Sequence, residues 1–305
     1  MLVAVTGSTG LIGTALVRRL EAEGHQVLRL TRSRPTRPNQ SRWDPMAGRI
    51  DADALARADA VVHLAGRGIG DGIRWTRRIK EEILQSRVRG TRLLAETMAG
   101  VAGSGGPRVL VCASGVHWYG DRGEEVLTES SPAGGGFLAE VVRQWEAAAD
   151  PARAAGLRVV HIRNGIVQAA EAPVVARQLP LFRLGLGGRL GSGRQWWSWI
   201  ALDDTVGLYR HALLSGDLDG PVNGTAPNPV TNAEYAATLA GVLGRPGFLT
   251  APELGLRLLL GELADELLLA SLRVQPAAAE ASGYTFSFPD LEPALRHVLH
   301  RPPRP

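Results

Sequence analysis

The sequence predicts an α/β fold: a Rossmann-type, doubly wound parallel sheet followed by a smaller, mixed C-terminal lobe. The chain opens with the apolar run MLVAVT, and glycines at 7, 10 and 13 follow before a helical pattern that ends at Gly24. Short apolar segments then alternate with helical segments up to about residue 165, which is typical of a parallel sheet covered on both faces. Beyond that point the alternation decays.

The opening strand, glycine turn and helix form a unit that is typical of dinucleotide binding. Glycines let the backbone turn tightly and approach a pyrophosphate, and the helix N-terminus supplies free N–H groups and the positive end of a dipole. The residues of this unit that we expect to contact a dinucleotide are Gly7, Thr9, Gly10, Leu11, Ile12 and Gly13.

The remaining elements of the first half follow from short apolar runs and from helical spacing of apolar residues. We expect strands over 2–5, 26–30, 60–64, 108–113 and 158–162. We expect helices over 11–23, 75–100, 137–155 and 203–215. In such a sheet, ligands bind at the carboxyl ends of the strands.

We expect two domains. Residues 1–165 would form the dinucleotide-binding domain, and residues 203–223 would return to it. Residues 166–202 and 224–305 would form a substrate lobe, because 166–200 is rich in Gly, Arg and Trp and the last 80 residues contain few strand signals. The tail 301–305, RPPRP, is expected to be disordered.

Composition narrows the functional classes. The chain has 305 residues, is 45% hydrophobic and has a formal net charge of +4. Its arginines are scattered, so we expect no nucleic-acid partner. The single cysteine, Cys112, excludes an internal disulfide and suits a reducing cytosol. No leader pattern precedes the first strand, so we expect a cytoplasmic protein.

The most apolar stretch, residues 254–272, contains four charged residues. We therefore expect a core helix or an interface helix there and no membrane contact. An interface helix would allow a homodimer.

Arginines follow the second predicted strand, where NAD-binding proteins usually place an acidic residue. Thr31 and Arg32 end that segment, and Arg34 is close by. A guanidinium suits the 2′-phosphate of NADP, so NADP is the expected cofactor. The alternative is that both arginines are solvated loop charges.

Three motifs together resemble the extended short-chain dehydrogenase/reductases, a family that includes sugar-nucleotide epimerases: TGSTGLIG, DAVVHLAG at 59–66, and Ser114 followed by Tyr119-Gly120. Further motifs are similar to an atypical, YfcH-type epimerase-like branch. These motifs are Trp43-Asp44-Pro45, Arg74-Trp75 with Lys80, Ser86-Arg87, Trp145-Glu146, residues 185–200, Asp203-Asp204, residues 223–227, residues 229–232 and Gly261-Glu262. The resemblance spans nearly the whole chain and implies NADP binding by a branch without an assigned reaction.

Typical members of the family use a YxxxK pair, in which the lysine lowers the pKa of the acid/base tyrosine. This chain has no such pair. The residues four positions after its tyrosines are Gly123, Leu213, Leu239 and Phe288. The sole lysine, Lys80, belongs to an earlier predicted helix, so fold analogy does not supply the chemistry.

Ser114, Tyr119 and Lys80 are the candidates to replace the missing pair. Ser114 lies where the family places a catalytic serine, although its spacing to Tyr119 is one residue longer. Ser114 would hydrogen-bond a substrate oxygen, or it would satisfy backbone groups in its turn. Without a lysine, Tyr119 would be a hydrogen-bond donor rather than a base.

The family pattern also implies cofactor contacts outside the glycine turn. The residues concerned are Leu64, Ala65, Gly66, Glu81, Arg87 and Arg163. For Lys80, Glu81 and Arg87 the alternative is a solvated helix face, and for Arg163 it is an internal ion pair. His63 interrupts an apolar strand, so we interpret it as structural.

Segment 187–200 combines glycines, cations and tryptophans, a combination that suits an anionic or ring-bearing ligand. Arg194 and Gln195 are the substrate-binding candidates, whereas Trp199 is expected in the core. The alternative is a loop packed on the sheet. Asp203-Asp204 is interpreted as a helix N-cap. No metal-ligand spacing occurs, so no metal site is expected.

Three functions are compatible with these patterns. The first is an NADP-dependent oxidoreductase or epimerase-like enzyme acting on a small polar, sugar-like or anionic substrate. The second is a non-catalytic NADP-binding redox sensor or regulatory module, favoured by the missing YxxxK pair. The third is an assembly role for the leucine-rich stretch 254–269.

Overall fold

The computed structural model describes residues 1–302, and its centre is an eight-stranded sheet in the order β13-β8-β6-β5-β1-β2-β3-β4. All neighbours pair in parallel except β3 and β4, which are antiparallel. The strands are β1 (Leu2–Thr6), β2 (Gln26–Thr31), β3 (Gln40–Asp44), β4 (Arg49–Ile50), β5 (Ala60–His63), β6 (Val109–Gly115), β8 (Arg158–Asn164) and β13 (Gly220–Gly224). The predicted Rossmann-type sheet is therefore confirmed.

The five predicted strands are all present, with ends displaced by one or two residues. Three strands of the sheet, β3, β4 and β13, were not predicted from the sequence. In β3, QSRWD, only Ser41 and Trp43 turn inward, so an edge strand with one buried face shows no apolar run.

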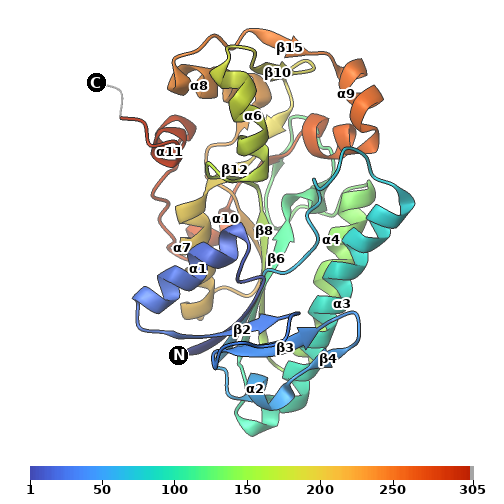
Figure 1. The fold of residues 1–305 in the computed structure, drawn as a ribbon, viewed down its shortest axis with the longest axis vertical. Coiled ribbons are helices and arrows are strands. Elements are labelled where there is room, and N and C mark those ends of the chain that lie inside the picture. Colours follow the sequence, from blue (N-terminus) through green and yellow to red (C-terminus); the bar gives the residue numbers. More distant parts are fainter. Residues whose placement is uncertain (303–305) are drawn as a thin grey trace.

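Helices cover both faces of the sheet. Figure 1 shows α1, α7 and α10 on one side and α3 and α4 on the other. Their bounds are α1 (Leu11–Ala22), α2 (Ala52–Ala56), α3 (Arg77–Val101), α4 (Phe137–Ala147), α5 (Asp150–Ala154), α7 (Leu202–Leu214) and α10 (Ala277–Ala281). The prediction of one helix over 137–155 is wrong: Pro151 cannot donate a backbone hydrogen bond and is the second residue of a separate helix, α5, which begins at Asp150.

Two apolar clusters sandwich the sheet because side chains alternate along each strand. Val3 and Val5 pack with Leu16 of α1 and Tyr209 of α7. Ala4 points to the opposite face, where the cluster contains residues of α3 and α5. This double burial explains why the strands are continuously apolar.

The second region is built from short strand pairs and helices around its own apolar cluster. That cluster includes Trp197, Trp199 and Tyr235, and the absence of exposed surface on Trp199 confirms its predicted core position. The remaining elements are β7 (Val126–Leu127), β9 (Ile166–Gln168), α6 (Pro173–Arg183), β10 (Gly188–Leu190), β11 (Trp196–Trp197), β12 (Trp199–Ala201), β14 (Val230–Thr231), α8 (Asn232–Leu243), β15 (Leu249–Ala251), α9 (Glu253–Leu260), the π-helix η3 (Ala264–Leu269), β16 (Arg273–Val274) and α11 (Leu291–Val298), with the 3-10 turns η1 (Ala102–Ser104) and η2 (Val116–Tyr119).

The domain division stays a prediction. Helix α7 and strand β13, within 203–223, do join the large sheet. Ala279 of α10 also packs against the core of that sheet, although the sequence assigned 224–305 to the substrate lobe. The predicted disorder of 301–305 partly concerns 303–305, which lie outside the described residues.

The leucine-rich stretch does not form a core helix. Leu254, Leu258 and Leu259 of α9 are each at least 60% exposed, and α9 has no buried residue. Burial resumes only at Leu263 and Ala264. The interface alternative therefore stays a prediction. Among residues 1–302, no helix combines the length and apolar character needed to cross a membrane.

Asp204 is not the N-cap of α7 that the sequence predicted. Helix α7 begins at Leu202 after Ala201, whose side chain caps nothing. The carboxylate of Asp204 instead accepts backbone N–H groups from Ser287 at 2.7 Å and from Phe288 at 2.9 Å. It thereby joins α7 to the chain that leads into α11.

The packing of α1 on β1 yields a stability prediction. A Cβ on Gly13 would lie 2.1 Å from the carbonyl oxygen of Gly7, a backbone atom that cannot move aside. We expect Gly13→Ala to lower the free energy of unfolding by about 1–3 kcal/mol in urea titrations. The control Gly100→Ala, in α3 with open space around it, should raise stability slightly because alanine favours helix. Equal stability of Gly13→Ala and the wild type would contradict this packing.

Candidate active site

The turns after β1 and β5 lie against each other at the carboxyl edge of the sheet. Gly7 has φ +65°, and a Cβ there would lie 2.8 Å from the carbonyl carbon of Leu64, so this close approach requires glycine. The Thr6 hydroxyl accepts the N–H groups of Leu64 at 3.1 Å and Ala65 at 3.2 Å. The two turns therefore form one rigid unit.

His63 completes this unit. Because the Thr6 oxygen already accepts two N–H groups, its proton is directed to Nδ1 of His63, 2.7 Å away, which places the histidine proton on Nε2. Burial, aided by the charge of Arg87, lowers the pKa of His63 to about 3. The ring also packs edge-on against Trp43, with 5.7 Å between centroids. His63 is structural, as the sequence predicted.

The end of β2 presents cations to solvent. The Thr31 hydroxyl accepts the N–H of Ser33 at 3.2 Å and shapes the turn. Arg32 and Arg34 are exposed, and neither forms an ion pair with any residue in the described part of the chain. The site therefore offers uncompensated positive charge where the sequence predicted a 2′-phosphate.

Arg87 is buried beside the turn that follows β5. Its Nη1 donates to the carbonyl oxygens of Arg67 at 2.9 Å and Ile83 at 3.0 Å, and its guanidinium stacks over Trp145. A Cβ on Gly66 would lie 3.4 Å from its guanidinium carbon. Within residues 1–302 no carboxylate pairs with it, and burial lowers its pKa to about 10.

Lys80 and Glu81 of α3 lie in different environments: Lys80 contacts the C-terminal segment, and Glu81 faces solvent. Lys80 pairs with Glu262 and lies 4.6 Å from the ring centroid of Phe137. Glu81 is exposed and does not line the cavity described below. The structure thus brings Arg87, but not Lys80 or Glu81, next to the turn after β5.

Ser114 and Tyr119 belong to a buried polar network. Glu146 of α4 accepts from the Ser114 hydroxyl at 2.6 Å and from Arg163 Nε and Nη2 at 2.9 and 2.8 Å. Tyr119 donates to the Asn223 side-chain oxygen at 2.7 Å and accepts from Arg163 Nη1 at 3.1 Å. Arg163 therefore makes the internal pair that the sequence left open.

The electrostatics of this network favour a structural role for Ser114 and Tyr119 over a catalytic one. Burial opposes ionisation of Glu146, but the hydrogen bonds and charge of Arg163 hold its pKa below the ordinary value. Burial raises the pKa of Tyr119 despite the neighbouring Arg163. The phenol stays protonated and is engaged on both sides, so it is a poor base. Neither Ser114 nor Tyr119 lines the cavity.

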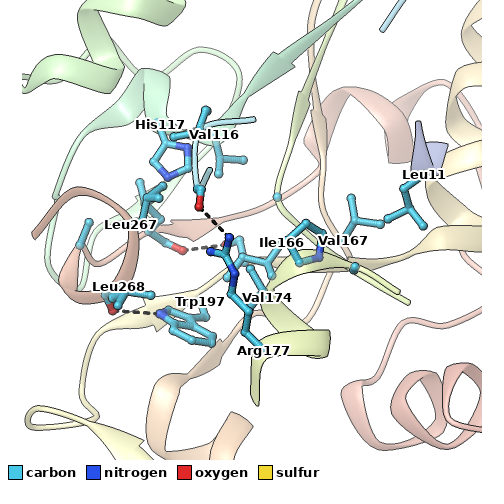
Figure 2. A pocket seen from close by; sticks show the side chains of 18 of the residues that line it. Leu11, Val116, His117, Ile166, Val167, Val174, Arg177, Trp197, Leu267 and Leu268 are labelled. Carbon is cyan, nitrogen blue, oxygen red and sulfur yellow. Dashed lines mark hydrogen bonds between the residues drawn. The ribbon is translucent and has the colours of Figure 1, made fainter. Parts of the chain in front are cut away.

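A cavity of about 630 Å³ runs from the glycine turn into the second region. Gly7, Gly10 and Leu11 line one end. Figure 2 shows Leu267, Leu268 and Trp197 gathered on one side of the pocket, with Leu11 and Val167 toward the other. The cavity thus joins the dinucleotide-type turn to a chamber formed by α6, β11 and η3.

His117 is a polar side chain on the cavity wall that the sequence did not indicate as a site residue. It follows β6 in η2 and is half-buried, and no hydrogen bond engages its ring among the described residues. Burial and the charge of Arg87 lower its pKa to about 4, so the imidazole is neutral at pH 7 with one donor and one acceptor. Its position just past a strand's carboxyl end was a signal available in the sequence.

The two predicted substrate residues lie away from the cavity wall. Gln195 is buried and its amide donates to the carbonyl oxygens of Leu190 and Leu268, both at 3.1 Å. Arg194 is exposed and does not line the cavity. The arginine that lines the cavity is Arg177 of α6, whose Nη2 donates to the Gly70 carbonyl oxygen at 2.7 Å.

Polar contacts hold the loop 66–76 and the segment 258–272, both of which contribute residues to the cavity wall. Arg74 donates to the carbonyl oxygens of Leu258 and Leu259 at the end of α9. Glu266 accepts the N–H groups of Phe137 and Leu138 at 2.9 and 3.1 Å and so caps α4. Together with the Lys80–Glu262 pair, these contacts close the chamber on the side of α3 and α4.

The residues present fit a dinucleotide. Gly10 carries no side chain in the cavity mouth, and a Cβ there would meet nothing closer than the Gly7 carbonyl oxygen at 3.4 Å. The N-terminus of α1, which Gly10 caps without a side chain, leaves backbone N–H groups for phosphate. In the described part of the chain, no group of three or more His, Cys, Asp or Glu side chains could hold a metal.

Comparisons with known proteins agree with this geometry. Residues 3–223 match the model of the NAD dependent epimerase/dehydratase family, and residues 251–298 match a domain of unknown function, DUF1731. The epimerase family protein ML0860 of Mycobacterium leprae is 41% identical over 300 residues, which are 98% of this chain and 96% of that protein.

Two solved structures are similar over most of the chain. The human epimerase family protein SDR39U1, determined with NADPH, is 35% identical with a TM-score of 0.87, covering 98% of this chain and 99% of that one. A nucleoside-diphosphate sugar epimerase from Corynebacterium glutamicum is 40% identical with a TM-score of 0.79, covering 98% of this chain and 58% of that one.

The buried His63 yields a pH prediction. Its folded-state pKa of about 3 lies below the ordinary 6.5, so between these values the unfolded chain binds the proton and stability falls as pH falls. His63→Asn should reduce the loss of unfolding free energy between pH 7 and 5 by about 1–2 kcal/mol, measured by urea titration at both pH values. The control His300→Asn, at an exposed position, should leave the loss unchanged. A loss as large in His63→Asn as in the wild type would exclude this origin.

Proposed function

Because the chain belongs to the NAD dependent epimerase/dehydratase family, we propose that it is an NADP-dependent oxidoreductase or epimerase-like enzyme that acts on a small molecule. The observation that carries this proposal is the continuous cavity from the glycine turn to His117 and the chamber beyond it. A site for a cofactor alone would not need that chamber. A reduced nicotinamide supplies a hydride when bound.

The proposed cofactor contacts follow the glycine turn and its neighbours. Gly7, Thr9, Gly10, Leu11, Ile12 and Gly13 would hold the diphosphate, and Leu64, Ala65 and Gly66 would flank it. Thr31 and Arg32 would select the 2′-phosphate, since Arg32 is exposed and unpaired within residues 1–302. The NADPH of the similar human structure supports this choice.

Arg87 would compensate the negative charge of the cofactor. A buried guanidinium without a carboxylate is costly, and an anion beside it would offset that cost. Arg87 lies beside Gly66, and the same turn holds Leu64, whose backbone lies against Gly7 of the glycine turn. In contrast, the charge of Arg163 is already neutralised by Glu146, so we assign Arg163 the role of positioning the end of β6.

His117 is the residue that we propose to face the reacting atoms. Its neutral ring could donate one hydrogen bond to a substrate oxygen or accept a proton from a hydroxyl. Ser114 and Tyr119 would position it, because the network of Glu146 and Arg163 fixes the end of β6 directly before η2. Lys80 would help to hold the chamber closed through its ion pair with Glu262 and its contact with the Phe137 ring.

A non-catalytic redox sensor is the second candidate. The burial of Ser114 and Tyr119 in a saturated network and the missing YxxxK pair favour it. The two candidates differ in hydride transfer. Loss of NADPH absorbance in a single turnover with a metabolite library would support the enzyme. No loss at saturating cofactor, with a partner protein that distinguishes the redox states, would support the sensor.

We also propose a cytoplasmic location and a homodimer. The buried, free thiol of Cys112 suits a reducing compartment. The exposed leucines of α9, Leu254, Leu258 and Leu259, would suit an interface between copies. Sedimentation as a monomer would exclude the homodimer.

Arg32 yields a prediction on cofactor choice. Arg32→Ala should weaken NADPH binding by about 10-fold to 100-fold, the effect of losing one or two charged hydrogen bonds, and should change NADH binding little. Calorimetric titration with both cofactors measures this. Arg18→Ala, which removes an exposed arginine of α1, is the matched control and should change neither. Equal losses for NADPH and NADH in Arg32→Ala would exclude a contact with the 2′-phosphate.

Arg87 yields a second prediction, because we propose that it binds the cofactor and does not stabilise the fold. Arg87→Met should leave the unfolding temperature of the cofactor-free protein unchanged or raise it, since a buried unpaired charge is removed. It should weaken NADPH binding at least tenfold and so reduce the rise in unfolding temperature that NADPH causes. The exposed Arg89→Met is the control. A less stable Arg87→Met that binds NADPH normally would assign Arg87 to structure alone.

A further inference from the structure

The far part of the cavity has an apolar wall. We call it the distal wall and define it by six residues from four segments of the second region: Val174, Leu190, Trp197, Leu263, Leu267 and Leu268. Figure 2 shows Val174, Trp197, Leu267 and Leu268 of this set around the pocket. A ligand in this chamber would therefore meet mainly carbon atoms.

The polar atoms near the distal wall already have partners within the protein. The Ser198 hydroxyl donates to the Leu272 carbonyl oxygen at 2.7 Å and accepts the Val274 N–H at 2.8 Å. The indole N–H of Trp197 faces the Leu268 carbonyl oxygen at 3.4 Å, and that of Trp196 donates to Glu124 at 2.7 Å. These groups cannot bind a ligand without giving up those bonds.

Few polar side chains are left for a ligand. His117 lines the cavity beside Leu267, as Figure 2 shows, and Gln178 of α6 also lines the cavity. Neither makes a side-chain hydrogen bond to another described residue. Arg177 of α6 is the one cation among the described lining residues; it is exposed, its Nη2 donates to the Gly70 carbonyl oxygen, and Figure 2 shows its guanidinium beside Leu267.

This distribution of polar atoms discriminates between ligand classes. A sugar nucleotide carries several hydroxyl groups and two phosphate charges, and each group buried without a partner is costly. An apolar body gains free energy from the same wall in proportion to the surface that it buries. One polar group at the His117 end would satisfy the imidazole N–H.

We propose that the chamber binds an apolar ketone or aldehyde, with the carbonyl oxygen at His117 and the hydrocarbon part against the distal wall, rather than a sugar nucleotide. This inference rests on the proposed function, in which His117 faces the reacting group. It replaces the small polar substrate that the sequence suggested.

A homologous series tests the inference without turnover. Binding of 2-butanone, 2-hexanone and 2-octanone to the NADP⁺-saturated protein is measured by calorimetry, with UDP-glucose as the opposing probe. The oxidised cofactor cannot reduce a ketone, so the measurement reports binding alone. Affinity should rise roughly threefold to fourfold for each added methylene, as expected for transfer to an apolar wall. UDP-glucose should not bind.

Variants locate the binding. Leu267→Asn and Val174→Thr should each weaken 2-octanone binding by about fivefold or more and flatten the dependence on chain length. Val174→Thr keeps the side-chain volume, so it tests polarity if Leu267→Asn unfolds. Leu184→Asn replaces an exposed leucine that follows α6 and lies outside the cavity, so it is the matched control, with unchanged affinity.

The outcomes separate this inference from the proposed function. Saturable UDP-glucose binding, a flat ketone series, or no binding of either probe to the NADP⁺-loaded protein would overturn the inference and leave the cofactor assignment standing. Failure to take up NADP⁺ would overturn the proposed function, and the ketone series on the cofactor-free protein would still decide the nature of the chamber.

Discussion

The close approach of two turns at the carboxyl edge of the sheet is the constraint on which the site depends. Gly7 lies against the backbone of Leu64, and the Thr6 hydroxyl ties both turns to His63 through three hydrogen bonds. This arrangement leaves no room for a side chain at Gly7 and directs the N-terminus of α1 toward the cavity. The positions of the cavity mouth and of the neighbouring Arg87 follow from it.

A second constraint explains why the residues with a familiar pattern are not on the cavity wall. The Glu146–Arg163 pair is buried, and such a pair is tolerated when further hydrogen bonds satisfy its atoms. Ser114 and Tyr119 supply these bonds. Their polar groups bind the pair, which leaves the ring of His117, without a hydrogen-bond partner among residues 1–302, as the group that we propose to face the substrate.

The chamber is closed by contacts between segments far apart in the chain. Arg74 binds the end of α9, Lys80 pairs with Glu262, and Glu266 caps α4. These polar contacts lie outside the chamber, whereas Leu263, Leu267 and Leu268 of the same segment line it. One short stretch thereby supplies both the polar contacts that hold the segment in place and the apolar side chains that line the chamber. The leucine-rich C-terminal segment therefore helps to decide which class of ligand the chamber binds.

The sequence by itself determined the parallel sheet, the glycine turn and the strands of the core, because double burial and tight turns require continuous apolar runs and glycine. It did not indicate the edge strand β3 or the division of 137–155 into α4 and α5. It also left the roles of Ser114 and Arg163 open, and it did not indicate that the ring of His117 lacks a hydrogen-bond partner among the described residues and lines the cavity. Only the tertiary structure decided these, because a polar side chain's function depends on which distant groups satisfy it: Glu146 reaches Ser114 across 32 positions, and no local pattern encodes that contact.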